Sequence, residues 1–168
     1  MITQKSQNSV FNTIEYSTIL SFYNTRRAER SKAFLMNHIN EGLLILMEYE
    51  RPLIELKAYC IHPIVQNGED IDTSWSDAYE LAIEYRDIAN SYLCRPKNDY
   101  IKTLDDMKNK IKPMSIGCAY NLLADKKQNQ KDFRLYHLGT HKRSNELEQY
   151  FINWINYLEF ILKNCYND

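Results

Sequence analysis

The chain has 168 residues and a nearly balanced charge, with 21 basic and 22 acidic side chains. This length suffices for one domain that buries roughly two-thirds of its unfolded surface. The balance excludes a general electrostatic attraction to nucleic acid or to anionic membranes. No apolar run approaches the roughly 18 residues of a membrane span, and the N-terminus has no apolar signal core. We therefore expect a cytoplasmic protein that binds neither membranes nor nucleic acid.

Apolar residues recur with a period near 3.6 almost throughout, and no stretch alternates convincingly with period two. The pattern predicts an all-α protein, a single compact helical domain of about six to seven helices over residues 1–168. The first helix is expected at residues 9 to 23. The second runs from Asn24-Thr25, which can cap it, to about Glu48. The third begins at Pro52, is interrupted at Pro63 because proline lacks a backbone N–H, and ends near Asn67-Gly68.

The pair Ser74 and Asp77 is typical of a capping box and predicts a fourth helix over about residues 75 to 94. Thr103 with Asp106 repeats the pattern for a short helix of mixed charge. Both pairs place a hydroxyl and a carboxylate where they can satisfy free backbone N–H groups.

The C-terminal third has a polar centre and an apolar end. A helix is expected to begin near Ser115. Residues 125 to 143 are rich in polar side chains, and we expect a short helix inside this segment that ends at Gly139. The last helix, from about Asn145, has the clearest apolar stripe, which is typical of core packing. The four cysteines lack a C-x-x-C pattern and indicate buried, reduced thiols. They are Cys60, Cys94, Cys118 and Cys165.

Two histidines interrupt apolar helical stripes. His38 and Glu41 lie three residues apart and therefore share one helix face. His62 follows an apolar run, with Gln66 one turn further along. The alternative interpretation is a pair of core-edge histidines that hydrogen-bond within their own helices.

The predicted fourth helix carries a dense set of polar residues beside its core face. Glu84, Asp87 and Ser91 fall on one side, and Arg86 and Asn90 lie four residues apart on a neighbouring line. Solvent exposure explains such a line equally well. Together with the two histidines, it is interpreted as the third wall of a pocket.

The order of a helical His, a second His near the end of the next helix and an Asp on a later helix resembles the HD-domain phosphohydrolases. These are all-α and hold a divalent metal with H…HD…D ligands. The resemblance covers about residues 26 to 95, and residues 100 to 165 form a further helical part. It implies His38, His62 and Asp87 as metal ligands and Mn, Fe, Ni or Zn as the ion. Pro63 stands where the family has the aspartate of its dyad. Glu41 or the loop with Asp70 and Asp72 could replace that aspartate, and Glu41 could instead be a neighbour of the ligands.

A second polar cluster offers cationic and imidazole groups that can bind a phosphate or carboxylate. A solvated loop explains it as well. Its members are Lys126, Lys131, His137, His141 and Arg143.

Two functions remain open from the sequence. The first is a metal-dependent phosphohydrolase, or a descendant that binds a nucleotide or another phosphorylated small molecule. In it Glu41, Arg86 and Asp87 serve catalysis. Substrate contacts then come from Gln66, Glu84, Asn90, Lys126, His137, His141 and Arg143. The second is a non-catalytic accessory protein that binds a host or viral protein. The chain resembles uncharacterised small proteins of tailed bacteriophages at residues 58–66, 84–93 and 124–143, and its 13 tyrosines suit an interface.

Overall fold

The computed structural model describes residues 8–29, 31–68, 70–93, 103–140 and 142–164. Within these ranges the regular structure consists of seven α-helices and one short 3₁₀ helix, without a strand, so the predicted all-α class is confirmed. The elements are η1 (Asn8–Asn12), α2 (Ile14–Tyr23), α3 (Leu35–Glu48), α4 (Leu53–Asn67), α5 (Tyr79–Ser91), α6 (Leu104–Lys110), α7 (Ile116–Tyr136) and α8 (Ser144–Asn164). None of the helices in the described ranges combines the length and apolar composition needed to cross a bilayer.

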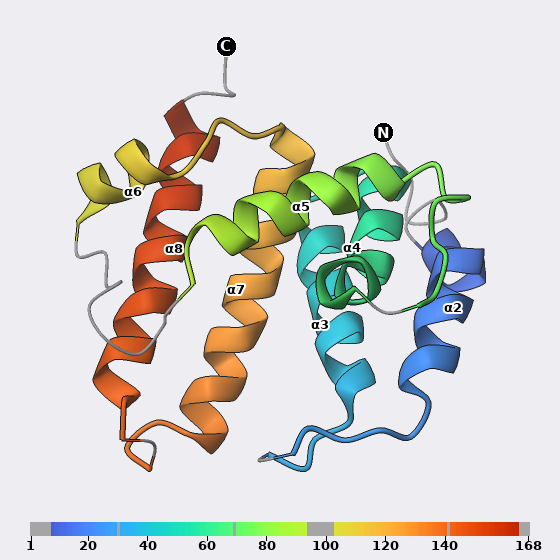
Figure 1. Ribbon diagram of the computed structural model, residues 1–168, viewed down its shortest axis with the longest axis horizontal. Coiled ribbons are helices and arrows are strands. Elements are labelled where there is room, and N and C mark those ends of the chain that lie inside the picture. The colour runs from blue at the N-terminus through green and yellow to red at the C-terminus, as the bar shows by residue number, and fades with distance from the viewer. Residues whose placement is uncertain (1–7, 30, 69, 94–102, 141, 165–168) are drawn as a thin grey trace.

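Helix α7 runs through the middle of the molecule (Figure 1). On one side α8 lies antiparallel to it, with α6 against α8, and on the other side lie α3 and α4. Helix α5 crosses α4 and α7, and α2 packs on α4 at the edge.

Two large apolar clusters meet at α7. One joins α5, α6, α7 and α8 around Trp154, which is fully buried. The other joins α2, α3 and α4 and includes Ala124 of α7. Because α7 contributes to both clusters, its middle turns face α3 and α4 from inside the protein.

The N-terminal helices differ from the prediction in their boundaries. The first predicted helix is divided at Thr13, whose hydroxyl accepts the N–H of Tyr16 at 3.2 Å and caps α2. The second begins at Leu35 rather than after Thr25. Residues 24–29 and 31–34 instead form an extended turn, in which Arg27 pairs with Phe34 in an antiparallel bridge. The Arg27 guanidinium lies 3.5 Å from the centre of the Phe34 ring, which favours this turn over a helix.

Helix α4 continues through Pro63 to Asn67, so the predicted interruption at the proline is wrong. Pro63 is buried and loses a single backbone hydrogen bond, which the packing of α4 against α3, α5 and α7 outweighs. The predicted stop is confirmed, since Gly68 adopts φ 65° immediately after the helix.

Of the two predicted capping boxes, only the second forms. The N–H and hydroxyl of Ser74 donate to Asp72 at 2.9 and 2.6 Å, and α5 begins later, at Tyr79. At α6, the hydroxyl of Thr103 accepts the N–H of Asp106 and the Asp106 carboxylate accepts the N–H of Thr103.

The polar segment from residue 125 belongs to the long helix α7, which contradicts the predicted short helix within it. Helix α7 begins where expected, with the Ser115 hydroxyl accepting the N–H of Cys118 at 3.2 Å. Its polar residues form hydrogen bonds and ion pairs with one another and with α3. These contacts allow this part of α7 to be buried without an apolar stripe. Cys60 and Cys118 are free, buried thiols as predicted, whereas Cys94 and Cys165 lie outside the described residues.

Candidate metal centre

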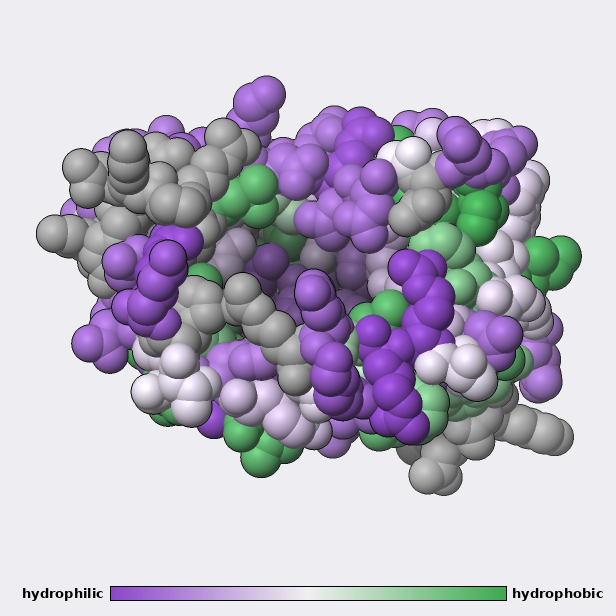
Figure 2. Space-filling view, turned by 60° about the horizontal axis from the view of Figure 1, so that its bottom comes forward, coloured by the Kyte–Doolittle hydropathy of each residue, from purple (hydrophilic) through white to green (hydrophobic). Residues whose placement is uncertain are grey.

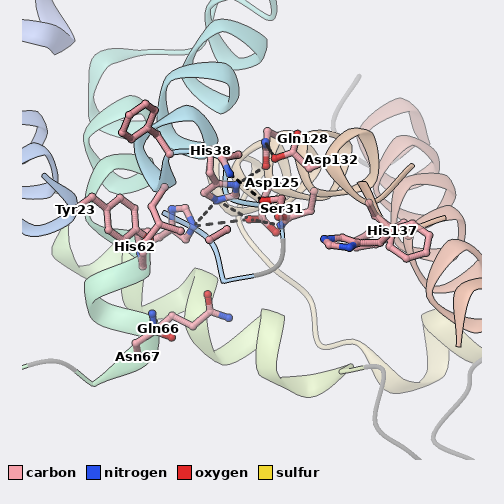
Figure 3. Close-up of a pocket in the computed structure, with 18 of the residues that line it drawn as sticks. Tyr23, Ser31, His38, His62, Gln66, Asn67, Asp125, Gln128, Asp132 and His137 are labelled. Atoms are coloured by element: carbon pink, nitrogen blue, oxygen red, sulfur yellow. Dashed lines mark hydrogen bonds and ion pairs between the residues drawn. The ribbon is translucent and has the colours of Figure 1, made fainter. Parts of the chain in front are cut away.

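Three side chains from three helices converge in the middle of the protein. They are His38 of α3, His62 of α4 and Asp125 of α7 (Figure 3). The Nε2 atoms of the two histidines are 3.5 Å apart. Asp125 Oδ1 lies 3.2 Å from Nε2 of His38 and 3.7 Å from Nε2 of His62. Among the described residues, this is the group of His, Cys, Asp and Glu side chains that can hold a metal ion.

A close approach of α3 and α4 brings the two histidines together. Gly42 lies one turn after His38, and Tyr59 of α4 fills the space beside it. A Cβ at position 42 would lie 2.0 Å from the Tyr59 hydroxyl oxygen, so any side chain there would push the helices apart. The Tyr59 ring also packs on His62, with ring centres 4.7 Å apart.

His62 is fixed by a carbonyl that Pro63 leaves free. In a regular helix the N–H of residue 63 donates to the carbonyl of Tyr59, but proline has no N–H. Nδ1 of His62 lies 2.6 Å from that carbonyl oxygen. Because a carbonyl only accepts, Nδ1 carries the proton and donates it, and the lone pair of neutral His62 is on Nε2, toward Asp125.

His38 is fixed by Gln128. Its Nδ1 lies 2.5 Å from the amide oxygen of Gln128. The amide nitrogen of Gln128 donates to Asp132 at 2.7 Å and to Glu41 at 3.3 Å. Because carboxylates only accept hydrogen bonds, the amide nitrogen must face them and the amide oxygen must face His38. His38 therefore also carries its proton on Nδ1 and directs Nε2 toward Asp125. Hydrogen bonds of this kind orient histidine ligands in metal sites.

The two oxygens of Asp125 have separate partners. Oδ1 faces the histidines and accepts a hydrogen bond from Asn129 at 3.0 Å. Oδ2 lies 3.0 Å from the ammonium of Lys126, which is buried between the rings of Tyr150 and Trp154. Lys126 therefore restricts Asp125 to one oxygen on the histidine side.

The charges of the group are strongly coupled. Burial lowers the pKa of His62 to about 3, which keeps its imidazole neutral. Burial also opposes protonation of His38, but the hydrogen bond to Asp125 and its charge raise the His38 pKa overall. Burial disfavours the Asp125 carboxylate, yet Lys126 and His38 together hold its pKa well below the usual range. Without another cation, the proton between His38 and Asp125 therefore holds the three atoms together.

The spacing of the three atoms fits a metal ion. Ligands at about 2.1 Å from an ion in tetrahedral geometry lie about 3.4 Å from one another. The observed separations of 3.2, 3.5 and 3.7 Å bracket this value. Two neutral imidazoles and a carboxylate are also a ligand set typical of Zn, Fe, Mn and Ni. The chain thus presents three oriented side chains that could hold a metal ion beside a pocket.

The three side chains line a pocket of about 490 Å³. Its walls include the loop before α3, the end of α4, the second half of α7 and the start of α8. This end of the protein is hollowed near its centre, with hydrophilic side chains at the floor (Figure 2). Gln66 and His137, for which the sequence interpretation predicts substrate contacts, both line the pocket.

The predicted metal ligand Asp87 does not lie with the histidines. It is exposed on α5, where Arg86 pairs with its carboxylate at 2.8 Å. The carboxylate beside the histidines is that of Asp125, the first residue of the polar segment 125 to 143, and the sequence interpretation gave Asp125 no role. Glu41 is not a substitute ligand either, because its carboxylate pairs with Lys131 and accepts from Gln128 behind His38.

The remaining predicted substrate contacts lie elsewhere. Glu84 accepts the N–H and the hydroxyl of Ser115 at 2.6 Å each and so supports the start of α7. Asn90 is exposed on α5 and does not line the pocket. Arg143 pairs with Glu146 at the start of α8, and His141 lies outside the described residues. Lys126 does not line the pocket and contacts Asp125 at Oδ2, the oxygen that faces away from the histidines.

Asp125 and Gln128 are the residues that sequence reasoning missed. The signal was the apolar period from Cys118 through Leu122, which continues over one turn to position 125 and on to Phe133. Extending the helix across the polar residues would have placed Asp125 on a buried face.

The chain matches no protein-family model, no curated protein and no solved structure. The interpretation of the centre therefore depends on its own geometry.

Proposed function

We propose that this protein is a metal-dependent hydrolase that binds one divalent transition-metal ion, Mn, Fe, Ni or Zn, through His38, His62 and Asp125, and acts on a phosphorylated small molecule. The observation that carries the proposal is the convergence of two Nε2 lone pairs and one carboxylate oxygen at metal-ligand spacing. Two imidazole nitrogens this close to a carboxylate oxygen need a shared cation, which is the proton on His38 in the metal-free protein and would be the metal ion in the loaded protein.

The surroundings of the group favour a functional site over a buried polar cluster. Each histidine is oriented by a hydrogen bond from Nδ1, and each of these bonds depends on a residue outside the group. Burying two histidines and a carboxylate for packing alone would be costly, because an apolar trio would stabilise the same space without desolvation.

The ion would supply Lewis acidity and lower the pKa of a bound water, which is the chemistry of hydrolysis at neutral pH. The chain's own residues hold the ligands and limit access. Tyr59 and Tyr85 pack against His62, with ring centres 4.7 and 4.6 Å away, and shield it from water. The open coordination positions of the ion would face the pocket, where Gln66 offers an amide to a substrate.

The test is hydrolysis of a panel of phosphate monoesters by protein reloaded with Mn²⁺ or Zn²⁺ after chelation. We expect activity that requires the metal and is lost in His38→Ala and His62→Ala. His137→Ala serves as a comparison, because it changes the pocket without touching a ligand. Activity that persists in both histidine variants would rule out the proposal.

A further inference from the structure

The pocket extends far beyond the three ligands. Asp125, Asp132 and His137 all line it from α7 and its C-terminal cap. At about 1.5 Å per residue, the stretch from Asp125 to His137 spans about 18 Å. Asp125 is 4% exposed, whereas Leu138, just beyond His137, is 45% exposed. His38, His62 and Asp125 thus form a buried part of an elongated pocket, and His137 lies well away from them along it (Figure 3).

The outer part of the pocket is aromatic. Phe133 of α7 and Phe151 of α8 both line it, with ring centres 5.7 Å apart. The His137 ring lies 6.4 Å from that of Phe133, and Leu147 adds an aliphatic side chain on the α8 side. Such walls bind planar or apolar groups by stacking and by burial of apolar surface.

The charge of the pocket limits the charge of its ligand. Among the described residues that line it, none is Lys or Arg, and Asp132, which pairs with Lys131 at 3.4 Å, places a carboxylate along its length. Around Asp125, the proposed divalent ion and Lys126 carry positive charge and the Asp125 carboxylate carries one negative charge. The net charge of these groups would be two positive charges. This matches the dianion of a phosphate monoester. A diphosphate or triphosphate brings more negative charge than these groups can balance, and extends it toward Asp132.

We infer that the ligand is a phosphate monoester of a planar aromatic group, with its phosphate at the ion and its ring against Phe133 and Phe151. This inference rests on the proposed metal centre. An aryl phosphate and a nucleoside monophosphate share this chemistry, because both carry one phosphoryl group and one planar ring.

Calorimetric titration of the Mn²⁺-loaded protein tests this assignment without relying on turnover. The probes are phenylphosphonate, 1-naphthylphosphonate, adenosine monophosphate and adenosine diphosphate. The second ring of the naphthyl group adds roughly 50 Å² of apolar surface, so we expect it to bind about tenfold more tightly than the phenyl compound. We also expect the monophosphate to bind more tightly than the diphosphate. Preference for the adenosine or the naphthyl monoester then identifies the source of the ring.

The matched variants are Phe151→Ala and Phe160→Ala. Both phenylalanines are half-buried on α8, but Phe160 packs under Lys108 and does not line the pocket. The naphthyl preference should disappear in Phe151→Ala and persist in Phe160→Ala. Equal affinity of the wild type for the two phosphonates, or tighter binding of the diphosphate, would overturn the inference. Binding without hydrolysis would contradict the proposed catalysis alone, and failure to load Mn²⁺ would contradict both.

Discussion

Lys126→Met should change the stability and the metal affinity of the protein in opposite directions. Lys126 is 6% exposed, and its ammonium lies 3.0 Å from Asp125 Oδ2. Methionine has a similar length and suits the apolar space beside Tyr150 and Trp154. It leaves the Asp125 carboxylate without its buried cation, however. Removing one partner of a buried ion pair costs about 3–5 kcal/mol of folding free energy, so the metal-free variant should unfold at a lower urea concentration.

The same substitution should tighten metal binding. An ion bound at Oδ1 would lie about 6 Å from the Lys126 ammonium, and at an effective dielectric constant near 20 even two unit charges at that distance repel by about 3 kcal/mol. Relief of this repulsion corresponds to roughly a hundredfold higher affinity.

Urea unfolding with chelator and calorimetric titration with Mn²⁺ or Zn²⁺ measure the two effects. Lys127→Met is the control, because the neighbouring Lys127 is half-buried and pairs with Glu159 away from the ligands. A Lys126→Met protein that folds and binds metal more weakly than the wild type would refute the electrostatic reasoning.

Two further predictions follow from the histidine geometry. Pro63→Ala restores a backbone N–H that competes with His62 Nδ1 for the Tyr59 carbonyl. Metal affinity, measured by calorimetric titration, should therefore fall about tenfold, as it does when a residue that orients a metal ligand is changed. Unchanged affinity would exclude a positioning role for the proline. The stability of the metal-free protein should peak near pH 6.5, where histidines of the unfolded chain titrate. Below this pH the unfolded state binds protons on both histidines, whereas the folded state keeps His62 neutral because its pKa is about 3. Above this pH only the folded state retains the proton on His38, because folding raises the pKa of His38. Urea unfolding between pH 5 and 8, with chelator present, measures this peak, and a His38→Gln variant should lose the decline on the alkaline side.

The parts of the fold that could be predicted are those set by local chemistry. Thr103 and Asp106 form the predicted capping box, and Gly68 ends α4, because caps depend on residues a few positions apart. The apolar stripe of α8 predicted the start of that helix to within one residue, since its partners need only be apolar.

The parts that could not be predicted depend on distant contacts. The second half of α7 has a polar sequence, and its polar residues are buried because Gln128 and Asp125 find partners on α3 and α4. For the same reason the candidate centre was half predicted. His38 and His62 stood out in apolar stripes. Asp87 was named because it follows them on a later helix, as in the HD-domain pattern, and that order does not reveal which carboxylate faces the histidines.

The most direct test of the centre is the metal content of protein purified without chelator, measured for the wild type, Asp125→Ala and Asp87→Ala. The wild type should contain about one equivalent of a transition metal, bound through the two imidazoles and Asp125. That metal should be lost in Asp125→Ala and retained in Asp87→Ala. A wild type that stays metal-free even after incubation with Mn²⁺, Fe²⁺, Ni²⁺ and Zn²⁺, or a variant at position 125 that binds metal as well as the wild type, would contradict the assignment.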